Sequence, residues 1–363
     1  MIISDLEFYP LEIESGLGDQ PIRTVVLRLS TYSGLDGWGE AAMPWRLSES
    51  VPRRDALLPI LVGRSVFDIV ELAELEALKE PALRSAIESA CWDLIGKTAK
   101  QPICRLLGGE YRHRAPVVVP LPDAPSDALP LLAREWAAQG FHWQTIPCTG
   151  ELEADVQRIE SIADAAGERV EFRLDGRCQY DMETARDLCR EIESRGIQLF
   201  YDPLKKPHAD PLPSNTGNAS AIADLISLGR QIDVPLGAAR TIGGPSDVLV
   251  AVRTEGVSGI AIEPQRVGGL LAALQCANVA HAAGIRAALG GAATLGIAAA
   301  ARLQLAACTP AFSLGNISTY VQLPEDVLVE PLEIVDGLIA VPLGPGIGVE
   351  VDRDKLERLA RSA

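Results

Sequence analysis

The sequence lacks any long uninterrupted run of apolar residues, although 47% of its 363 residues are apolar. A helix that crosses a membrane needs about 20 consecutive apolar residues, so no membrane span is expected. Residues 1–5 contain neither the basic nor the apolar segment of an export signal. We therefore expect a cytoplasmic protein that does not associate with membranes.

Positive charge is scarce. Lysine and arginine total 33 against 49 acidic residues, so the formal net charge is −16. Proteins that bind nucleic acids or anionic membranes carry basic patches, and this balance argues against both classes of partner.

Paired cysteines are also missing. The seven cysteines are an odd number, and no two of them form a CxxC pair. Disulfide bonds and a zinc site are therefore not expected. We interpret most of these cysteines as small buried side chains in a reducing compartment.

The chain is long enough for two domains. Residues 7–13 and 22–31 are rich in β-branched and aromatic residues and predict two strands joined by a glycine-containing turn. In residues 81–97 the apolar positions recur at helical spacing. Residues 1–115 are thus predicted to form an α+β domain.

After residue 115 short apolar runs alternate with longer amphipathic stretches. Eight such runs predict strands at residues 116–120, 140–147, 170–175, 196–203, 233–238, 257–263, 284–289 and 311–316. Eight strands that alternate with helices favour a (β/α)₈ barrel over an open sheet. We place the barrel at residues 116–325, and we expect residues 326–363 to return to the first domain.

The connection at residues 205–215 is rich in proline and longer than a loop after a barrel strand needs to be. Loops of this kind lie on the active-site face of a barrel. Two interpretations stay open, contact with a ligand and a tolerated surface insertion.

Several motifs occur in order along the chain. They are GWGEA at 37–41, AIESACWDLIGK at 86–97, PICRLLGG at 102–109, RVGG at 266–269 and VPLGPGIGV at 341–349. Together they resemble the mandelate racemase and muconate lactonizing branch of the enolase superfamily. The resemblance implies a (β/α)₈ barrel with an α+β N-terminal capping domain, and a homo-oligomer.

The resemblance also implies a chemistry. In this family three carboxylates, at the ends of the third, fourth and fifth strands, hold Mg²⁺, which binds a small carboxylate substrate. A base on the second or sixth strand, or a histidine on the seventh, removes the proton next to that carboxylate. The cation stabilises the enediolate that forms.

The family's metal positions are altered in this chain. Asp175 stands where the first ligand is expected, with Arg177 two residues later in place of the usual asparagine. Tyr201 occupies the second position, since Asp202 lies one residue late and strand alternation points it the other way. Arg240 stands where the third carboxylate region is expected. Two of three ligand positions are lost, so no cofactor is expected, although Mg²⁺ is the family default.

The family's bases are altered as well. No lysine occurs between residues 101 and 204, so the second strand cannot supply one. None of the four histidines lies on the seventh predicted strand. Glu263 stands at the position of the sixth-strand base and could serve in that role.

These residues suggest a hypothesis in which Arg240 binds the substrate carboxylate in place of the metal. Asp175 would orient Arg240, Glu263 would be the general base and Tyr201 would donate a proton or hydrogen bond. The alternative for Asp175 and Arg240 is a structural ion pair that fills a vacated site.

Four further residues are predicted to contact the substrate. Arg177 and Lys205 follow the third and fourth predicted strands and could reach an anionic group. Trp45 and Arg46 fall where the family's capping loops close over the substrate.

The sequence therefore predicts a divergent isomerase or lyase that acts on a small carboxylate or carbonyl compound without a metal. Two alternatives stay open. One is a homologue that has lost catalysis and binds a small molecule or a protein partner. The other is an ordinary Mg²⁺-dependent racemase or dehydratase that recruits Asp202 and another acid.

Overall fold

The N-terminal part forms an antiparallel sheet covered by helices. The computed structural model describes residues 1–14, 21–124, 127–205, 217–253, 255–291 and 293–362. The sheet has the order β1 (Ile3–Ile13), β2 (Ile22–Thr31) and β3 (Asp36–Ala41). Its helices are α1 (Leu47–Leu61), α2 (Ile69–Ala73), the 3₁₀ turn η1 (Glu76–Leu78), α3 (Pro81–Ala99) and α4 (Ile103–Leu106). We call β1–β3 with α1–α4 the cap.

The cap sheet and α3 pack closely because two glycines leave room. A Cβ atom on Gly37 or Gly39 of β3 would collide with the α3 backbone at Ala90 or Ala86. The GWGEA motif thus lets a strand lie directly on a helix. The apolar residues of α3, including Leu83 and Leu94, complete the core on that side.

Eight parallel strands close into a barrel. They are β4 (Arg114–Pro120), β5 (Trp143–Pro147), β6 (Glu171–Asp175), β7 (Leu199–Tyr201), β8 (Leu236–Ala238), β9 (Gly259–Ile262), β10 (Arg286–Leu289) and β11 (Asn316–Ile317). Neighbouring strands pair in chain order, and the pairing of β11 with β4 closes the ring. Each of the eight predicted runs overlaps one of these strands. The predicted fold, a (β/α)₈ barrel with an α+β N-terminal domain, is confirmed.

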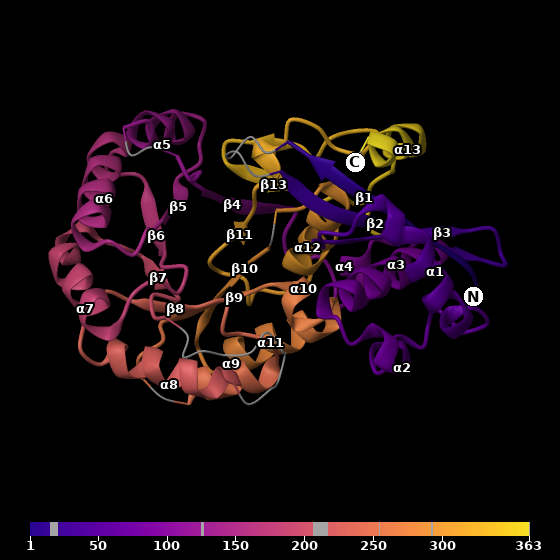
Figure 1. Ribbon diagram of the computed structural model, residues 1–363, viewed down its shortest axis with the longest axis horizontal. Coiled ribbons are helices and arrows are strands. Elements are labelled where there is room, and N and C mark those ends of the chain that lie inside the picture. Colours follow the sequence, from indigo (N-terminus) through magenta and orange to yellow (C-terminus); the bar gives the residue numbers. More distant parts are fainter. Residues whose placement is uncertain (15–20, 125–126, 206–216, 254, 292, 363) are drawn as a thin grey trace.

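Helices cover the outside of the barrel (Figure 1). They are α5 (Leu129–Ala138), α6 (Leu152–Ala166), α7 (Met182–Glu191), η2 (Glu193–Arg195), α8 (Gly217–Gly229), α9 (Pro245–Val252), α10 (Pro264–Val267), α11 (Leu270–Ala282), α12 (Gly296–Cys308) and η3 (Tyr320–Gln322). The alanine-rich helix α12 is buried from Gly296 to Ala307. It packs against both α4 and β3 of the cap and β4 of the barrel.

The C-terminal segment lies along both parts. Strands β12 (Ile334–Val335) and β13 (Leu338–Ala340) form a hairpin that pairs antiparallel with β4. The last helix, α13 (Arg353–Ser362), packs against β1 of the cap (Figure 1). Between them the Ile347 N–H donates to the buried Asp93 carboxylate of α3 at 3.0 Å.

Some expectations need correction or fall outside the described residues. Strands β12 and β13 had no separate strand prediction, because two- and three-residue strands carry no measurable alternation. The proline-rich connection predicted at residues 205–215 lies outside the described residues except for Lys205. In the described part of the chain no helix has the length and apolar character to cross a membrane.

Candidate functional site

An ion pair stands at the carboxyl ends of the barrel strands. Asp175 is the last residue of β6, and Arg240 follows β8 by two residues. Arg240 Nη2 lies 2.9 Å from Asp175 Oδ2. Both side chains are partly exposed, 28% for Asp175 and 38% for Arg240. The pair therefore spans the strand between them, β7, at the edge where barrel enzymes place their active sites.

Arg177 completes the surroundings of Asp175. Its backbone N–H donates to Asp175 Oδ1 at 3.1 Å, so both carboxylate oxygens accept a hydrogen bond. The Arg177 side chain points elsewhere and forms an ion pair with Asp123, 2.8 Å between Nη1 and Oδ2. Arg177 thus ties the loop after β4 to the loop after β6.

Asp202 supports the turn that carries Arg240. Its carboxylate accepts hydrogen bonds from the backbone N–H groups of Ala239, at 3.2 Å, and Arg240, at 2.6 Å, and from the Thr241 hydroxyl at 3.3 Å. The side chain is buried, and Asp202 has a left-handed φ of 41°. Burial raises the pKa of Asp202, and the N–H groups of Arg240 and Ala239 oppose that rise.

Tyr201 lies inside the barrel below the ion pair. Its ring packs on Gly237 of the next strand and contacts a small apolar cluster that includes Leu199 and Leu314. The hydroxyl is buried, and its polar neighbour is the Arg173 guanidinium. Burial raises the pKa of Tyr201, and the nearby Arg173 cation opposes this, so the phenol is protonated at neutral pH. Its role as a donor to the substrate stays a prediction.

Glu263 caps the short helix that follows β9. Its backbone carbonyl accepts the N–H groups of Arg266 and Val267. Glu263 Oε2 lies 3.0 Å from Arg266 Nη2, and the Glu263 side chain is 17% exposed. Because β8 pairs with β9, Glu263 and Arg240 follow neighbouring strands.

Sequence comparison decides the family. Residues 9–108 match the model "Mandelate racemase / muconate lactonizing enzyme, N-terminal domain". Residues 128–355 match the model "Enolase C-terminal domain-like". The chain belongs to the enolase superfamily. Within it, the chain is an enzyme of the mandelate racemase and muconate lactonizing branch, as the motifs indicated.

Relatives in this superfamily cover nearly the whole chain. Muconate cycloisomerase 1 of Rhodococcus opacus is 26% identical over 94% of this chain and 92% of its own length. N-succinyl-L-Arg/Lys racemase of Bacillus cereus is 21% identical over 93% of this chain and 90% of its own. The crystal structure of 2-chloromuconate cycloisomerase from Rhodococcus opacus 1CP superposes with a TM-score of 0.87, at 21% identity and 99% coverage of both chains. The homologues are isomerases, lyases and racemases.

The superfamily's magnesium chemistry can be compared with the side chains present. Mg²⁺ prefers an octahedral set of oxygen ligands. Here the Asp175 oxygens face Arg240 and the Arg177 N–H, and the Asp202 oxygens face the β8 turn. No group of three His, Cys, Asp or Glu residues in the described ranges is placed to hold a metal ion. These residues do not fit the magnesium site of the superfamily.

One group of buried polar residues between the cap and the barrel was not predicted from the sequence. Arg302 of α12 is buried, and burial lowers the pKa of its guanidinium while the carboxylates of Glu40 and Glu263 raise it. A cavity of about 10 Å³, room for about one water molecule, lies beside them. Its polar lining is Glu40, Ser85, Ser89, Glu263, Gln265 and Arg302. The sequence signal for this group of residues was the GWGEA motif, which contains Glu40.

Trp45 and Arg46 lie between β3 and α1 of the cap, and Lys205 follows β7 of the barrel. The Trp45 ring packs edge-on against Phe8 at 5.2 Å between centroids, and the Arg53 guanidinium lies 4.2 Å from its centroid. Arg46 is exposed and directly precedes α1, and its N–H donates to the Glu49 carboxylate. Lys205 is exposed beyond β7. Their substrate contacts stay predictions.

Proposed function

We propose that this enzyme removes a proton next to the carbonyl or carboxylate carbon of a small compound, as an isomerase or lyase, without a metal ion. The Asp175–Arg240 pair carries this proposal. It places a partly exposed guanidinium at the barrel edge where the superfamily holds its cation. A guanidinium presents parallel N–H donors that match a carboxylate, so Arg240 could bind the substrate anion directly.

Asp175 and Asp202 fix Arg240 from two sides. The first contacts its guanidinium and the second its backbone N–H. A cation held in this way loses little freedom when it binds an anion, which favours pre-organised electrostatic stabilisation. An arginine polarises a carbonyl less than Mg²⁺ does. The proposal therefore favours substrates with a more acidic α-proton, such as a thioester, ketone or imine.

Glu263 is the proposed general base. Glu263 follows strand β9, and Arg240 follows the neighbouring strand β8. A substrate bound to Arg240 would therefore lie beside Glu263. Glu263 would take the α-proton, and the electron pair would pass to the carbonyl oxygen near Arg240. Return of a proton to carbon completes an isomerisation, and departure of a β-substituent completes an elimination.

A second function rests on the same ion pair. Asp175 and Arg240 satisfy each other, and Asp202 is satisfied by backbone, as in a site that has closed over a lost metal. A homologue without catalysis would still bind a small anion in the barrel mouth. Location in the cytoplasm and assembly into a homo-oligomer remain predictions.

Proton exchange with solvent distinguishes these functions. The purified protein is incubated in D₂O with EDTA and, separately, with Mg²⁺, using muconate, N-succinyl-L-arginine and an acyl thioester as probes. Deuterium incorporation or product formation is followed by NMR. Glu263→Gln is the test variant, and Glu333→Gln, an exposed partner of Arg114, is the matched control.

The proposal expects exchange that EDTA leaves unchanged, that Glu263→Gln abolishes and that Glu333→Gln preserves. Exchange that appears only with Mg²⁺ would overturn the metal-free mechanism. Thermal stabilisation by a probe without any exchange would favour the binding function instead.

A further inference from the structure

The cap holds the turn after β9 at several points. The Gln265 side chain donates to the Glu40 carbonyl at 3.1 Å and accepts from the Ala42 N–H at 2.7 Å. Both contacts join the end of cap strand β3 to helix α10 of the barrel. The turn that begins at Glu263 is therefore anchored to a different part of the chain.

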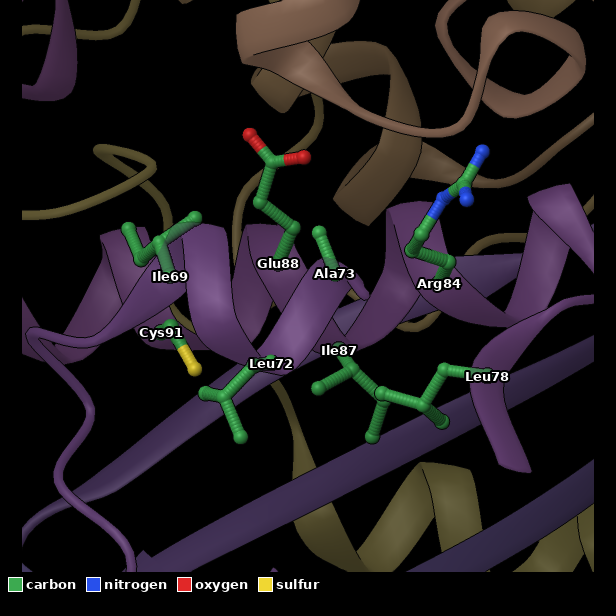
Figure 2. Close-up of a pocket in the computed structure, with 8 residues that line it drawn as sticks. All are labelled: Ile69, Leu72, Ala73, Leu78, Arg84, Ile87, Glu88 and Cys91. Atoms are coloured by element: carbon green, nitrogen blue, oxygen red, sulfur yellow. The ribbon is translucent and has the colours of Figure 1, made fainter. Parts of the chain in front are cut away.

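Two side chains of cap helix α3 hold the other end of the same turn. Arg84 Nε donates to the Gly268 carbonyl at 3.1 Å, and Glu88 Oε1 accepts the Leu271 N–H at 2.9 Å. A Cβ atom on Gly268 or Gly269 would collide with the Arg84 guanidinium or the Glu88 carboxylate. Figure 2 shows Arg84 and Glu88 extending from α3 toward the barrel ribbon, away from Leu72 and Leu78 below the helix.

The turn is short and internally bonded. The N–H groups of Gly268 and Gly269 both donate to the Pro264 carbonyl, and Glu263 caps the intervening helix. Gly268 and Gly269 have φ values of 96° and 144°, which favour glycine. Gly269 and Glu263 thus belong to one compact hydrogen-bonded unit.

We propose that Glu88 is a positioning residue that holds the turn after β9, and with it Glu263, in place over the barrel mouth, and that its charge sets how firmly the turn is held. The part that concerns Glu263 rests on the proposed function. The part that concerns the turn rests on the contacts of α3 with Gly268, Gly269 and Leu271.

Glu88 is suited to control the turn through its charge because it is buried among few other charged groups. Burial raises the pKa of Glu88 to about 7, and the N–H groups of Leu271, Trp92 and Leu270 and the Arg84 cation oppose the rise. On α3 the Cys91 thiol is the other titratable neighbour, and burial raises its pKa. Elements α2 and η1 face the cavity beside Glu88 with apolar residues only, Ile69, Leu72, Ala73 and Leu78.

In this proposal, release of the turn exposes Glu88 to water and returns its pKa toward the ordinary value, and the direction of the pH effect follows from that difference. A carboxyl whose pKa is higher in the held state than in the released state favours the held state when protonated. The contribution of Glu88 is fully present below its ordinary pKa of 4.5 and is lost as the pH rises through about 7. The cap should therefore hold the turn less firmly at pH 8 than at pH 5.5.

Hydrogen exchange of the full-length protein tests the inference directly. Protection factors for peptides that span residues 264–273 are measured by mass spectrometry between pH 5.5 and 8, with correction for intrinsic exchange. We expect protection in the wild type to fall about ten-fold or more over this range. Glu88→Gln, a neutral side chain of the same shape, should reduce the change to less than about three-fold.

Glu76→Gln is the matched control, since Glu76 is an exposed cap residue whose ion pair with Lys79 lies at the surface. It should behave as the wild type does. A wild-type protection factor that is flat with pH would overturn the inference even if Glu88→Gln did not fold. An equal pH dependence in the wild type and Glu88→Gln would overturn it as well.

Activity gives a separate answer. With N-succinyl-L-arginine as the probe, wild-type exchange into substrate should decline above pH 7 through kcat, and Glu88→Gln should remove that decline. No substrate exchange in either protein would count against the proposed function for this probe. Hydrogen exchange would still decide the role of Glu88.

Discussion

Arg240 Nη2 lies 2.9 Å from Asp175 Oδ2, across the end of strand β7. The superfamily places a divalent cation and its carboxylates at this edge, whereas this chain places a guanidinium and one carboxylate. In the proposed function, a guanidinium with a single positive charge takes the place of the divalent cation, and hydrogen bonds take the place of metal coordination. Several consequences can be measured.

Replacement of Arg240 should weaken both binding and catalysis. Arg240→Ala is expected to lower proton exchange by about 100-fold or more, since a donor aimed at developing charge is worth that much. Arg240→Lys keeps the charge but loses the planar fork, so it should recover only part of the rate. The control is Arg114→Ala, which removes an exposed ion pair with Glu333. Full activity in Arg240→Ala would contradict the assignment.

Magnesium should not bind tightly. Because the oxygens of Asp175 and Asp202 face hydrogen-bond donors, the protein is expected to show no stoichiometric Mg²⁺ binding by calorimetry. Elemental analysis of the purified protein is the companion measurement. Tight one-to-one binding would mean that the barrel mouth rearranges around the metal.

Asp202 is expected to matter for stability. Asp202→Ala leaves the partly buried N–H groups of Ala239 and Arg240 without their buried acceptor, so we expect a loss of about 2–4 kcal/mol in the free energy of unfolding. Urea unfolding measures this loss. Asp187→Ala, in an exposed ion pair with Arg190, should stay within about 0.5 kcal/mol of wild type. A similar small effect for both variants would show that Asp202 does not support the turn.

The C-terminal segment should depend on one glycine. Gly346 has a φ of 73°, and a Cβ atom there would strike the Asp93 carboxylate. Gly346→Ala is therefore expected to lower the free energy of unfolding by about 3 kcal/mol or more, from backbone strain and the collision together. Gly34→Ala shares the left-handed backbone, with a φ of 80°, but meets nothing nearby, so it should lose only about 1 kcal/mol. Equal losses would exclude a contribution from the collision.

The pH dependence of stability should follow the buried acids. Burial raises the pKa values of Glu40, Asp93 and Asp202. Carboxyls of this kind stabilise the folded state below their ordinary pKa, and that contribution is lost as the pH rises through the folded value. Compared with wild type, Glu40→Gln should lose less stability between pH 5 and 9 in urea titrations. If the free energy of unfolding falls equally with pH in both proteins, Glu40 is excluded as a source of the pH dependence.

Some features of the fold could be predicted because their causes are local. Strand and helix periodicity is written in neighbouring residues, so the eight runs predicted the eight barrel strands. The altered residues Tyr201 and Arg240 could also be read from the chain, because each follows a recognisable strand. Asp202 was expected to point away from the metal position, and its carboxylate turns to the backbone after β8.

Other features required the tertiary structure because their causes are distant in sequence. The sequence determined the barrel and the family, and it predicted the loss of the ordinary ligand set. Only the folded chain decided that Glu40 and Arg302 share a buried seam and that Glu88 holds the turn after Glu263. The burial, the hydrogen-bond partners and the charge state of Glu88 and Glu40 depend on residues about 180 to 260 positions away in the sequence. No local pattern encodes such pairings, because they arise when α3 and β3 pack against helices α10, α11 and α12.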